Sequence, residues 1–212
     1  SSAASDVYKR QVILDPIANP KQWSTKGRGL SRKGNALVLS SDGIDLRYLC
    51  SMDRFIFETE IEFTHSKRID NYISFRFPKL STGRKERKYI ILVFSDGTIQ
   101  VKYSKKLLGQ RKGLWKKNTA NRFRLVVERE HIAIGVNGKT VLDVQGPEFP
   151  YKGGFQISPN ILNSECRILL KDMKLYLPAL SEKTYPWIEL IKGNSLEEAG
   201  WEYFSPTTQG FK

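Results

Sequence analysis

The sequence predicts an all-β fold, in which two antiparallel sheets pack face to face as a jelly-roll-like sandwich. Apolar residues alternate with polar ones, or form short blocks rich in Val, Ile, Phe and Tyr, and helical periodicity is nearly absent. Turn residues separate these blocks about every 8–12 residues, which is typical of sandwiches and barrels. About eleven strands result, which is more than one flat sheet usually holds, so two stacked sheets are expected.

The strands are expected, in chain order, at Ala36–Leu39, Ile44–Leu49, Phe55–Phe63, Asn71–Phe77, Lys88–Phe94, Thr98–Tyr103, Arg122–Glu128, His131–Val136, Thr140–Val144, Phe155–Ser158 and Cys166–Leu177. Two tight hairpins join four of them. Asp96-Gly97 lies inside "YIILVFSDGTIQVKY", and Asn137-Gly138 lies inside "HIAIGVNGKTVLDV". These dipeptides tolerate the positive φ that short hairpin turns require.

One strand carries three acids at alternating positions. In "FETEIEF", three acids, Glu58, Glu60 and Glu62, alternate with Phe57, Thr59, Ile61 and Phe63. One face of the strand is therefore expected to meet solvent and the other to be buried. Glycoside hydrolysis needs two carboxylates flanking the bond, and such a row could supply them. The simpler interpretation, which we favour, is a solvated outer face.

Composition favours an acidic partner. The chain has 212 residues and a net charge of +13, and it contains no run of roughly 18 apolar residues that could span a membrane. A basic chain attracts nucleic acid, anionic lipid or acidic polysaccharide. Eleven of the basic residues lie in two predicted loops, Pro78–Lys88 and Ser104–Asn118.

Cysteines and acids give weak signals for covalent or metal chemistry. Cys50 and Cys166 are too few for a metal site or a disulfide framework. They are either two buried thiols or one bridge, which would need an oxidising compartment. Asp42, Asp45 and Asp70 are acids of predicted turns, and turn formation alone explains them.

Six stretches of the chain form a recognisable series: "WSTKGRGLSRKGNALVLSS", "RFIFETEIEF", "NYISFRFP", "NRFRLVVEREHIAIGVNGKTVLDV", "GGFQIS" and "RILLKDMKLYLP". In this order they resemble the concanavalin A-like lectin/glucanase superfamily, and most closely the bacterial 3-keto-disaccharide hydrolase-like domain family. The resemblance implies a jelly-roll sandwich, export to the periplasm or cell exterior, and carbohydrate handling. It also makes a structural calcium possible, which Asp42, Asp45 and Asp70 could hold, and no other cofactor is expected. Ile90 stands where the family has an acid, and neither Ser nor Gly follows Asn71, which favours binding over catalysis.

The strand "NYISFRFP" is the best candidate for a binding surface. Alternation places Tyr72, Ser74 and Arg76 on one face, where a guanidinium can donate to sugar hydroxyls and a ring can stack on a pyranose. Neighbouring strands add Tyr89, Gln100 and Lys102, and the resemblance adds Gln156. Trp115, in the basic segment "GLWKK", is a further stacking candidate, or else an anchor that pins the segment to the core. For the strand residues, the alternative is a plain solvated face.

The chain is expected to have three parts. Residues 1–11 resemble translated sequencing adapter in assembled metagenomic DNA, so we expect a non-native leader. Residues 12–178 form the sandwich. Residues 179–212 are expected to be a linker and the truncated start of a second copy, because Trp201 aligns with Trp23; the alternative is a C-terminal extension of the first domain.

The sequence therefore predicts a carbohydrate-binding module of a larger exported bacterial protein, located in the periplasm or outside the cell. Flanking domains of the same polypeptide are expected, and the glycan could be anionic. A glycoside or 3-keto-glycoside hydrolase is the alternative. Nucleic-acid binding through the basic loops is the least favoured, since charge alone supports it.

Overall fold

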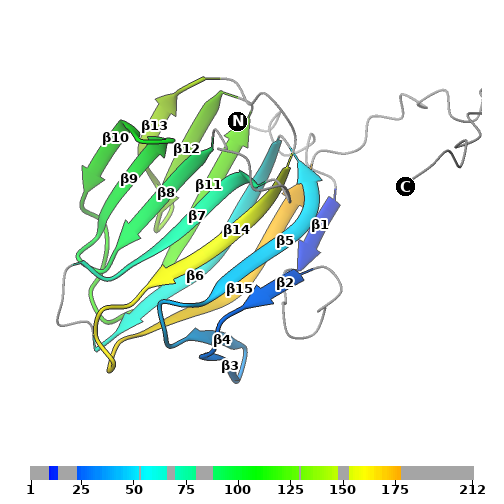
Figure 1. The fold of residues 1–212 in the computed structure, drawn as a ribbon. Helices are drawn as coiled ribbons and strands as arrows, with labels where there is room; N and C mark the ends of the chain where they lie inside the picture. The colour runs from blue at the N-terminus through cyan, green and yellow to red at the C-terminus, as the bar shows by residue number, and fades with distance from the viewer. Residues whose placement is uncertain are drawn as a thin grey trace, which may run out of the picture. The chain divides into compact units, whose positions relative to one another are not determined.

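The computed structural model describes residues 10–13, 23–52, 54–65, 70–79, 88–128, 130–147 and 153–177, and every regular element in them is a β-strand (Figure 1). These ranges contain fifteen strands, and all of the pairings between them are antiparallel. The strands form two sheets, so the predicted all-β sandwich is confirmed. In the described ranges no helix is long and apolar enough to cross a membrane.

The first sheet, here called sheet A, has the strand order β13-β12-β11-β6-β15-β4-β3, and β1 also pairs with β15. Its strands are β1 (Arg10–Ile13), β3 (Leu30–Lys33), β4 (Ala36–Leu39), β6 (Arg54–Thr64), β11 (Asn121–Glu128), β12 (His131–Val136), β13 (Lys139–Gln145) and β15 (Arg167–Leu177).

The second sheet, sheet B, has the order β10-β9-β8-β7-β14-β5-β2 and faces the viewer in Figure 1. Its strands are β2 (Trp23–Lys26), β5 (Asp45–Met52), β7 (Tyr72–Lys79), β8 (Tyr89–Phe94), β9 (Thr98–Tyr103), β10 (Lys106–Lys112) and β14 (Gly153–Asn160).

An aromatic cluster fills the space between the sheets. Phe75 of sheet B is fully buried, and its ring lies 5.4 Å from Phe57, 5.1 Å from Phe123 and 5.9 Å from Phe155, measured between ring centroids. Phe57 and Phe123 belong to sheet A, so these contacts tie the two sheets together. Stacked and edge-on ring pairs contribute beyond simple burial of area. The other inward positions of both sheets are filled mainly by Val, Ile and Leu, together with further aromatic rings, Cys166 and Met173.

The eleven predicted strands all exist, and four others do not follow from the sequence pattern. β2 and β3 are four-residue strands of mostly polar sequence. β10 lies inside Ser104–Asn118, so the prediction that this segment is a loop is wrong. The sequence of β10 lacks the alternation of polar and apolar residues, because its register with β9 shifts between Leu107 and Gly109. β1 pairs with the end of β15 and includes two residues of the predicted leader, Arg10 and Gln11.

Both hairpin turns form as predicted. Asn137 and Gly138 have φ of 50° and 80°, and Gly97 has φ of 84°, the left-handed region that these residues tolerate. The Asn137 side chain also holds the turn in place, because its Nδ2 donates to the Leu114 carbonyl and its Oδ1 accepts from the Arg122 backbone N–H. Each turn therefore fixes the register of the two strands that it joins.

β10 and β13 are edge strands of the two sheets, and they meet along one side of the sandwich. Gly109 of β10 is so close to β13 that an added Cβ would lie 2.7 Å from Cγ1 of Val144. Leu108, beside the β10 register shift, packs against the core from this side. The two sheets thus approach each other at this edge.

Some predictions fall partly or wholly outside the described residues. The second copy at 179–212, with Trp201, lies outside them, as do residues 80–87 of the first basic loop. Cys166 is a buried thiol, whereas the side chain of Cys50 is not among those described.

Candidate functional site

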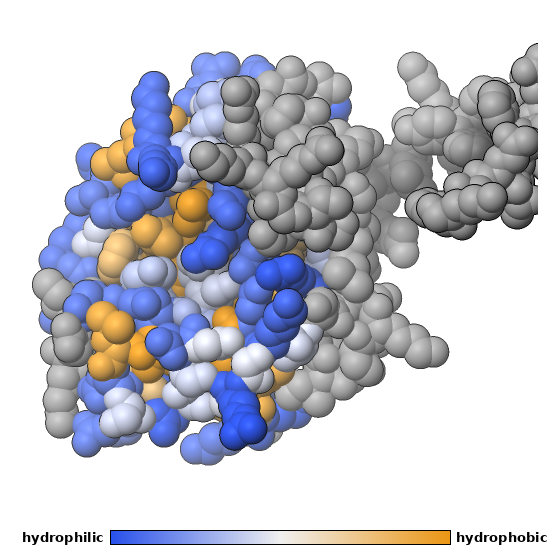
Figure 2. Space-filling model, viewed as in Figure 1, coloured by the Kyte–Doolittle hydropathy of each residue, from blue (hydrophilic) through white to orange (hydrophobic). Residues whose placement is uncertain are grey.

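The outward face of sheet B carries most of the residues that the sequence singled out. In β7, Ile73, Phe75 and Phe77 point into the core, so Tyr72 and Arg76 point outward and are half-buried. Figure 2 shows this side of the molecule, where hydrophilic and hydrophobic groups are interspersed. The alternation predicted for this strand is the one observed.

Strand register places outward residues in a row across sheet B. Gln156 of β14 lies opposite Arg47 of β5 on one side and opposite Arg76 of β7 on the other. Arg76 lies opposite Ile90 of β8, which lies opposite Lys102 of β9. We call Arg47, Gln156, Arg76, Ile90 and Lys102 the cation row.

A second row, two residues along each strand, is uncharged. Ser74 lies opposite Ser158 and Leu92, and Gln100 lies opposite Leu92 and Gln110. Gln100 Nε2 donates to Gln110 Oε1 at 2.9 Å. We call these residues the neutral row. Ser74 is fully buried and donates its hydroxyl to the Ser158 carbonyl at 2.8 Å.

Hydrogen bonds link β14 to β5. Gln156 Nε2 donates to Ser158 Oγ at 3.0 Å, and Ser158 Oγ donates to Asp45 Oδ1 at 3.2 Å. Arg47 donates from Nε and Nη2 to the other oxygen of Asp45, at 3.0 and 2.8 Å. Asp45 is therefore occupied by Arg47 and Ser158 in the structure, and it is part of this network as well as next to a turn.

Two polar atoms at the centre of the cation row lack partners. Gln156 is only 4% exposed, and its Oε1 accepts no hydrogen bond; Arg76 Nε, on the adjacent strand, donates none, and both atoms are buried. No carboxylate among the described residues pairs with Arg76. A buried acceptor without a partner costs about 1–3 kcal/mol, and native proteins rarely leave one without a reason.

An aromatic pair lies further along the same face. Tyr72 and Phe94 are opposite each other on β7 and β8, with ring centroids 5.2 Å apart. Both side chains are half-buried. They give the face an apolar edge beside its polar rows.

The structure does not bring Tyr89 and Trp115 to this face. Tyr89 is fully buried, stacks on Phe77, and donates its hydroxyl to the Pro147 carbonyl, so its inclusion among the binding residues does not fit its position. Burial raises its pKa well above the usual range for tyrosine. Trp115 packs against the core beside Phe63, at 6.0 Å between ring centroids, which is the position of an anchor.

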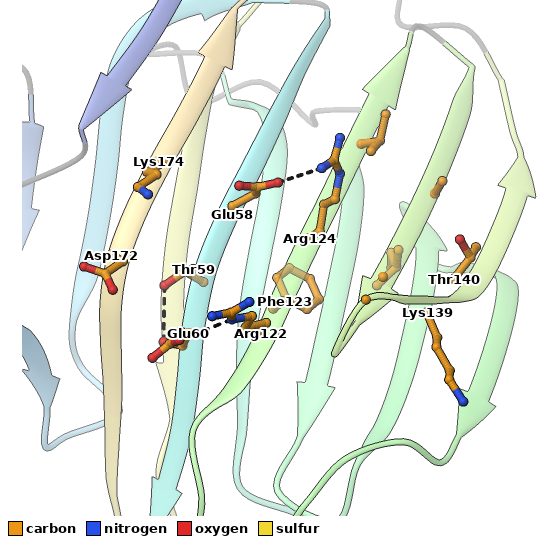
Figure 3. Close-up of a pocket in the computed structure, with 15 residues that line it drawn as sticks. Glu58, Thr59, Glu60, Arg122, Phe123, Arg124, Lys139, Thr140, Asp172 and Lys174 are labelled. Carbon is orange, nitrogen blue, oxygen red and sulfur yellow. Dashed lines mark hydrogen bonds and ion pairs between the residues drawn. The ribbon is translucent and has the colours of Figure 1, made fainter. Parts of the chain in front are cut away.

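A hollow of about 570 Å³ lies on the opposite side of the sandwich, on the outward face of sheet A (Figure 3). It exists because β12 presents two small residues to it, Ala133 and Gly135, next to the larger side chains of β11. The predicted acidic row lines part of it, but its charges are paired. Glu58 binds Arg124 at 2.8 Å and Glu60 lies 3.6 Å from Arg122.

The third acid of that row, Glu62, binds Lys171 at 3.2 Å. A glycosidase acid must carry a proton, which pairing with a cation disfavours. The acidic row therefore has the arrangement of a solvated sheet face with cross-strand ion pairs.

The described residues include no cluster of three or more His, Cys, Asp or Glu arranged to hold a metal ion. Of the three turn acids considered for calcium, Asp45 is the one engaged in the network above. The sequence analysis missed Arg47 and Ser158. The alternation of "DLRYLC", with Leu46 and Tyr48 buried, was the signal that could have placed Asp45 and Arg47 outward.

No protein-family model and no curated protein matches this chain. Solved structures do match in fold. A carbohydrate binding module, CBM66, from Bacillus subtilis is 16% identical, with a TM-score of 0.55 over 72% of this chain and 94% of that one. A protein of unknown function with a galectin-like fold, also from Bacillus subtilis, is 12% identical, with a TM-score of 0.61 over 80% and 96%.

The exoplasmic/lumenal domain of VIP36, solved with Ca²⁺ and Man3GlcNAc bound, is 12% identical, with a TM-score of 0.59 over 80% of this chain and 89% of that one. At these identities the likeness establishes the fold. The chain is a jelly-roll sandwich of the galectin-like, concanavalin A-like class. The narrower 3-keto-disaccharide hydrolase-like family remains a prediction from the sequence motifs.

Proposed function

We propose that this protein is a carbohydrate-binding module that holds a glycan on the outward face of sheet B. The observation that carries the proposal is that Arg76 and Gln156 lie opposite each other on adjacent strands, and that Arg76 Nε and Gln156 Oε1 are both buried without partners. A sugar hydroxyl both donates and accepts a hydrogen bond, so one hydroxyl can satisfy both atoms. The fold supports the proposal, since structures of the same fold include a carbohydrate binding module and a domain solved with a bound oligosaccharide.

Ligand contact requires a small movement. Both unpartnered atoms are closed to solvent in this conformation, whereas Arg76 as a whole is half-buried. A rotamer change of Arg76, which faces solvent in part, would open the pair to a hydroxyl. The rest of the face already has sugar-binding chemistry, with amides at Gln100 and Gln110 and a ring edge at Tyr72.

Charge favours an acidic glycan. Arg76 has no carboxylate partner among the described residues, and Asp45 is the one acid of those residues that bonds to a member of the cation row, Arg47. A partly buried guanidinium without a counter-ion gains from an anionic ligand group. A uronate or sulfate polymer fits this face. Such polymers occur outside the cell, and the protein would meet them there as a module of a larger secreted bacterial protein.

A hydrolase is less well supported on this face. The usual mechanism needs two carboxylates flanking the scissile bond. On the outward face of sheet B, within the described residues, Asp45 is the acid in reach of the cation row, and it is engaged by Arg47 and Ser158. Binding therefore accounts for the arrangement better than catalysis.

A glycan array that carries acidic and neutral oligosaccharides tests the proposal with three proteins: the wild type, Arg76→Ala, and Arg122→Ala as a matched control. Arg122 lies on sheet A with 83% of its side chain exposed. We expect glycan signals for the wild type and the control, and a loss of roughly tenfold or more for Arg76→Ala. Absence of binding to every glycan, or an equal loss in both variants, would contradict the proposal.

A further inference from the structure

The cation row has a period of two strands. Its members alternate between a basic residue and an uncharged one: Arg47, Gln156, Arg76, Ile90, Lys102, taken from β5, β14, β7, β8 and β9 in order. The neutral row beside it is uncharged on β14, β7, β8 and β9, and its position on β5 is the acid Asp45, which bonds to Ser158. Of these two rows, only the cation row carries positive charge, and it does so on every second strand.

Sheet geometry sets the interval. Neighbouring strands lie about 4.8 Å apart, so residues on alternate strands of one row are separated by about 9.6 Å. That is close to the length of one disaccharide in an extended polysaccharide. The full row, from Arg47 to Lys102, crosses four strand spacings or about 19 Å, which is the length of two disaccharides.

The residues between the cations also fit an alternating ligand. Gln156 offers its unpartnered Oε1 to a neutral sugar, and Ile90 offers a half-buried apolar side chain. A chain whose acid groups fell on every sugar would place one acid over each of these two residues. An acid over Gln156 Oε1 meets an acceptor instead of a donor, and an acid over Ile90 loses hydration without gaining a partner.

We infer that the glycan is an extended acidic polysaccharide that lies across the strands of sheet B, with an acid group on every second sugar. This inference rests on the proposed function, since it specifies the ligand of the same face. Arg76 takes the central acid and Lys102 an outer one. In the neutral row, the amides of Gln100 and Gln110 bind hydroxyls along one side of the chain.

Arg47 is the weakest of the three cation positions. Its Nε and Nη2 both donate to Asp45, so a ligand acid there competes with a carboxylate that is already in place. Arg76 and Lys102 have no such competitor among the described residues. We therefore expect the ligand to gain more from these two positions than from Arg47.

Calorimetric titration at one fixed ionic strength tests the inference with four probes of matched length. Hyaluronan oligosaccharide carries a carboxylate on alternate sugars, oligogalacturonate carries one on every sugar, cello-oligosaccharide carries none, and a single-stranded oligonucleotide supplies phosphates. We expect hyaluronan to bind at least about threefold more tightly than each of the other probes, because one exposed ion contact supplies about that factor.

Variants locate the contacts. Lys102→Gln should weaken hyaluronan binding by about two- to fivefold and Arg76→Gln by about tenfold. Lys139→Gln, an exposed residue of β13 on sheet A, should leave it unchanged. Thermal melting of each variant confirms that it is folded.

The outcomes separate this inference from the function on which it rests. If cello-oligosaccharide or oligogalacturonate binds as tightly as hyaluronan, the periodic ligand is wrong while glycan binding stands. If Lys139→Gln weakens binding as much as Lys102→Gln, net charge and not the row carries the effect, and the inference is again wrong. Tighter binding of the oligonucleotide than of every glycan would overturn the inference and the proposed function together.

Discussion

Replacing Gln156 with methionine should stabilise the protein while it weakens ligand binding. Gln156 is 4% exposed, and its two polar atoms have opposite situations: Nε2 donates to Ser158 Oγ at 3.0 Å, and Oε1 is buried without a partner. Methionine has a similar size and shape, so the substitution leaves no cavity and forces no overpacking. It removes one hydrogen bond and one unsatisfied acceptor at once.

The magnitude follows from these two terms. Losing the hydrogen bond to Ser158 costs about 0.5–1.5 kcal/mol, and removing the buried unpaired acceptor returns about 1–3 kcal/mol. Ser158 keeps its bond to Asp45, so no new buried group is left unsatisfied. The free energy of unfolding should therefore rise by about 1 kcal/mol, which for a domain of this size raises Tm by about 2–4 °C.

Urea denaturation of the wild type and Gln156→Met measures the change, with Gln100→Met as the control. Gln100 is half-buried on the same face, and its hydrogen-bond partner Gln110 is exposed to solvent. Its substitution should therefore change the free energy of unfolding by less than about 0.5 kcal/mol. A destabilisation of Gln156→Met by more than about 1 kcal/mol would refute the reasoning, because it would mean that Oε1 has a partner in solution.

Three further substitutions probe other parts of the fold. Phe75→Ala removes the central ring of the core and should lower the free energy of unfolding by about 3–5 kcal/mol in urea; a loss under about 1 kcal/mol would contradict its central position. Burial raises the pKa of Tyr89, so the folded state keeps a proton that an unfolded tyrosine loses near pH 10. Stability should hold below that pH and fall as pH rises beyond it, and Tyr89→Phe should flatten the decline in a urea-midpoint series; an unchanged decline would exclude Tyr89 as its source. Burial acts to raise the pKa of Asp96, but hydrogen bonds from Lys112 and Thr98 outweigh it and lower the pKa. The ionised Asp96 carboxylate therefore stabilises the folded state above about pH 3.9, the pKa of aspartate in an unfolded chain, and this stabilisation is lost as pH falls further. Asp96→Asn should make the urea midpoint less sensitive to acid. Equal sensitivity in both proteins would argue against this role of Asp96.

Alternation predicted the fold well because the core of a sandwich imposes it. Wherever one face of a strand meets the other sheet, as in β6 and β7, the sequence shows period two and the strand is found. β10 breaks the rule because a bulge changes which residues face inward, and β2 and β3 break it because they are short and mostly polar. β2 is held by pairing with β5, which is not its neighbour in the chain, β3 by a short hairpin with β4, and β10 forms across a register shift; none of these leaves a period-two pattern.

The candidate site was predictable in part for the same reason. Period two placed Tyr72 and Arg76 outward, but it could not show that Tyr89, which is polar at one end, points into the core and bonds to Pro147. The cation row itself depends on the register of five strands. Register follows from turns and bulges far apart in the chain, so the row emerges only from the three-dimensional structure.

The meeting of β10 and β13 bears on how the protein behaves at high concentration. The open edge of a sheet can recruit a strand from a second molecule and start aggregation. β10 carries three features that oppose this: basic residues at Lys106, Arg111 and Lys112, a bulge after Leu107, and the close approach of β13 at Gly109. An intermolecular strand would have to bring its own backbone to a charged, irregular and partly covered edge. The same segment that the sequence presented as a basic loop thus protects the sandwich from growing into a fibre.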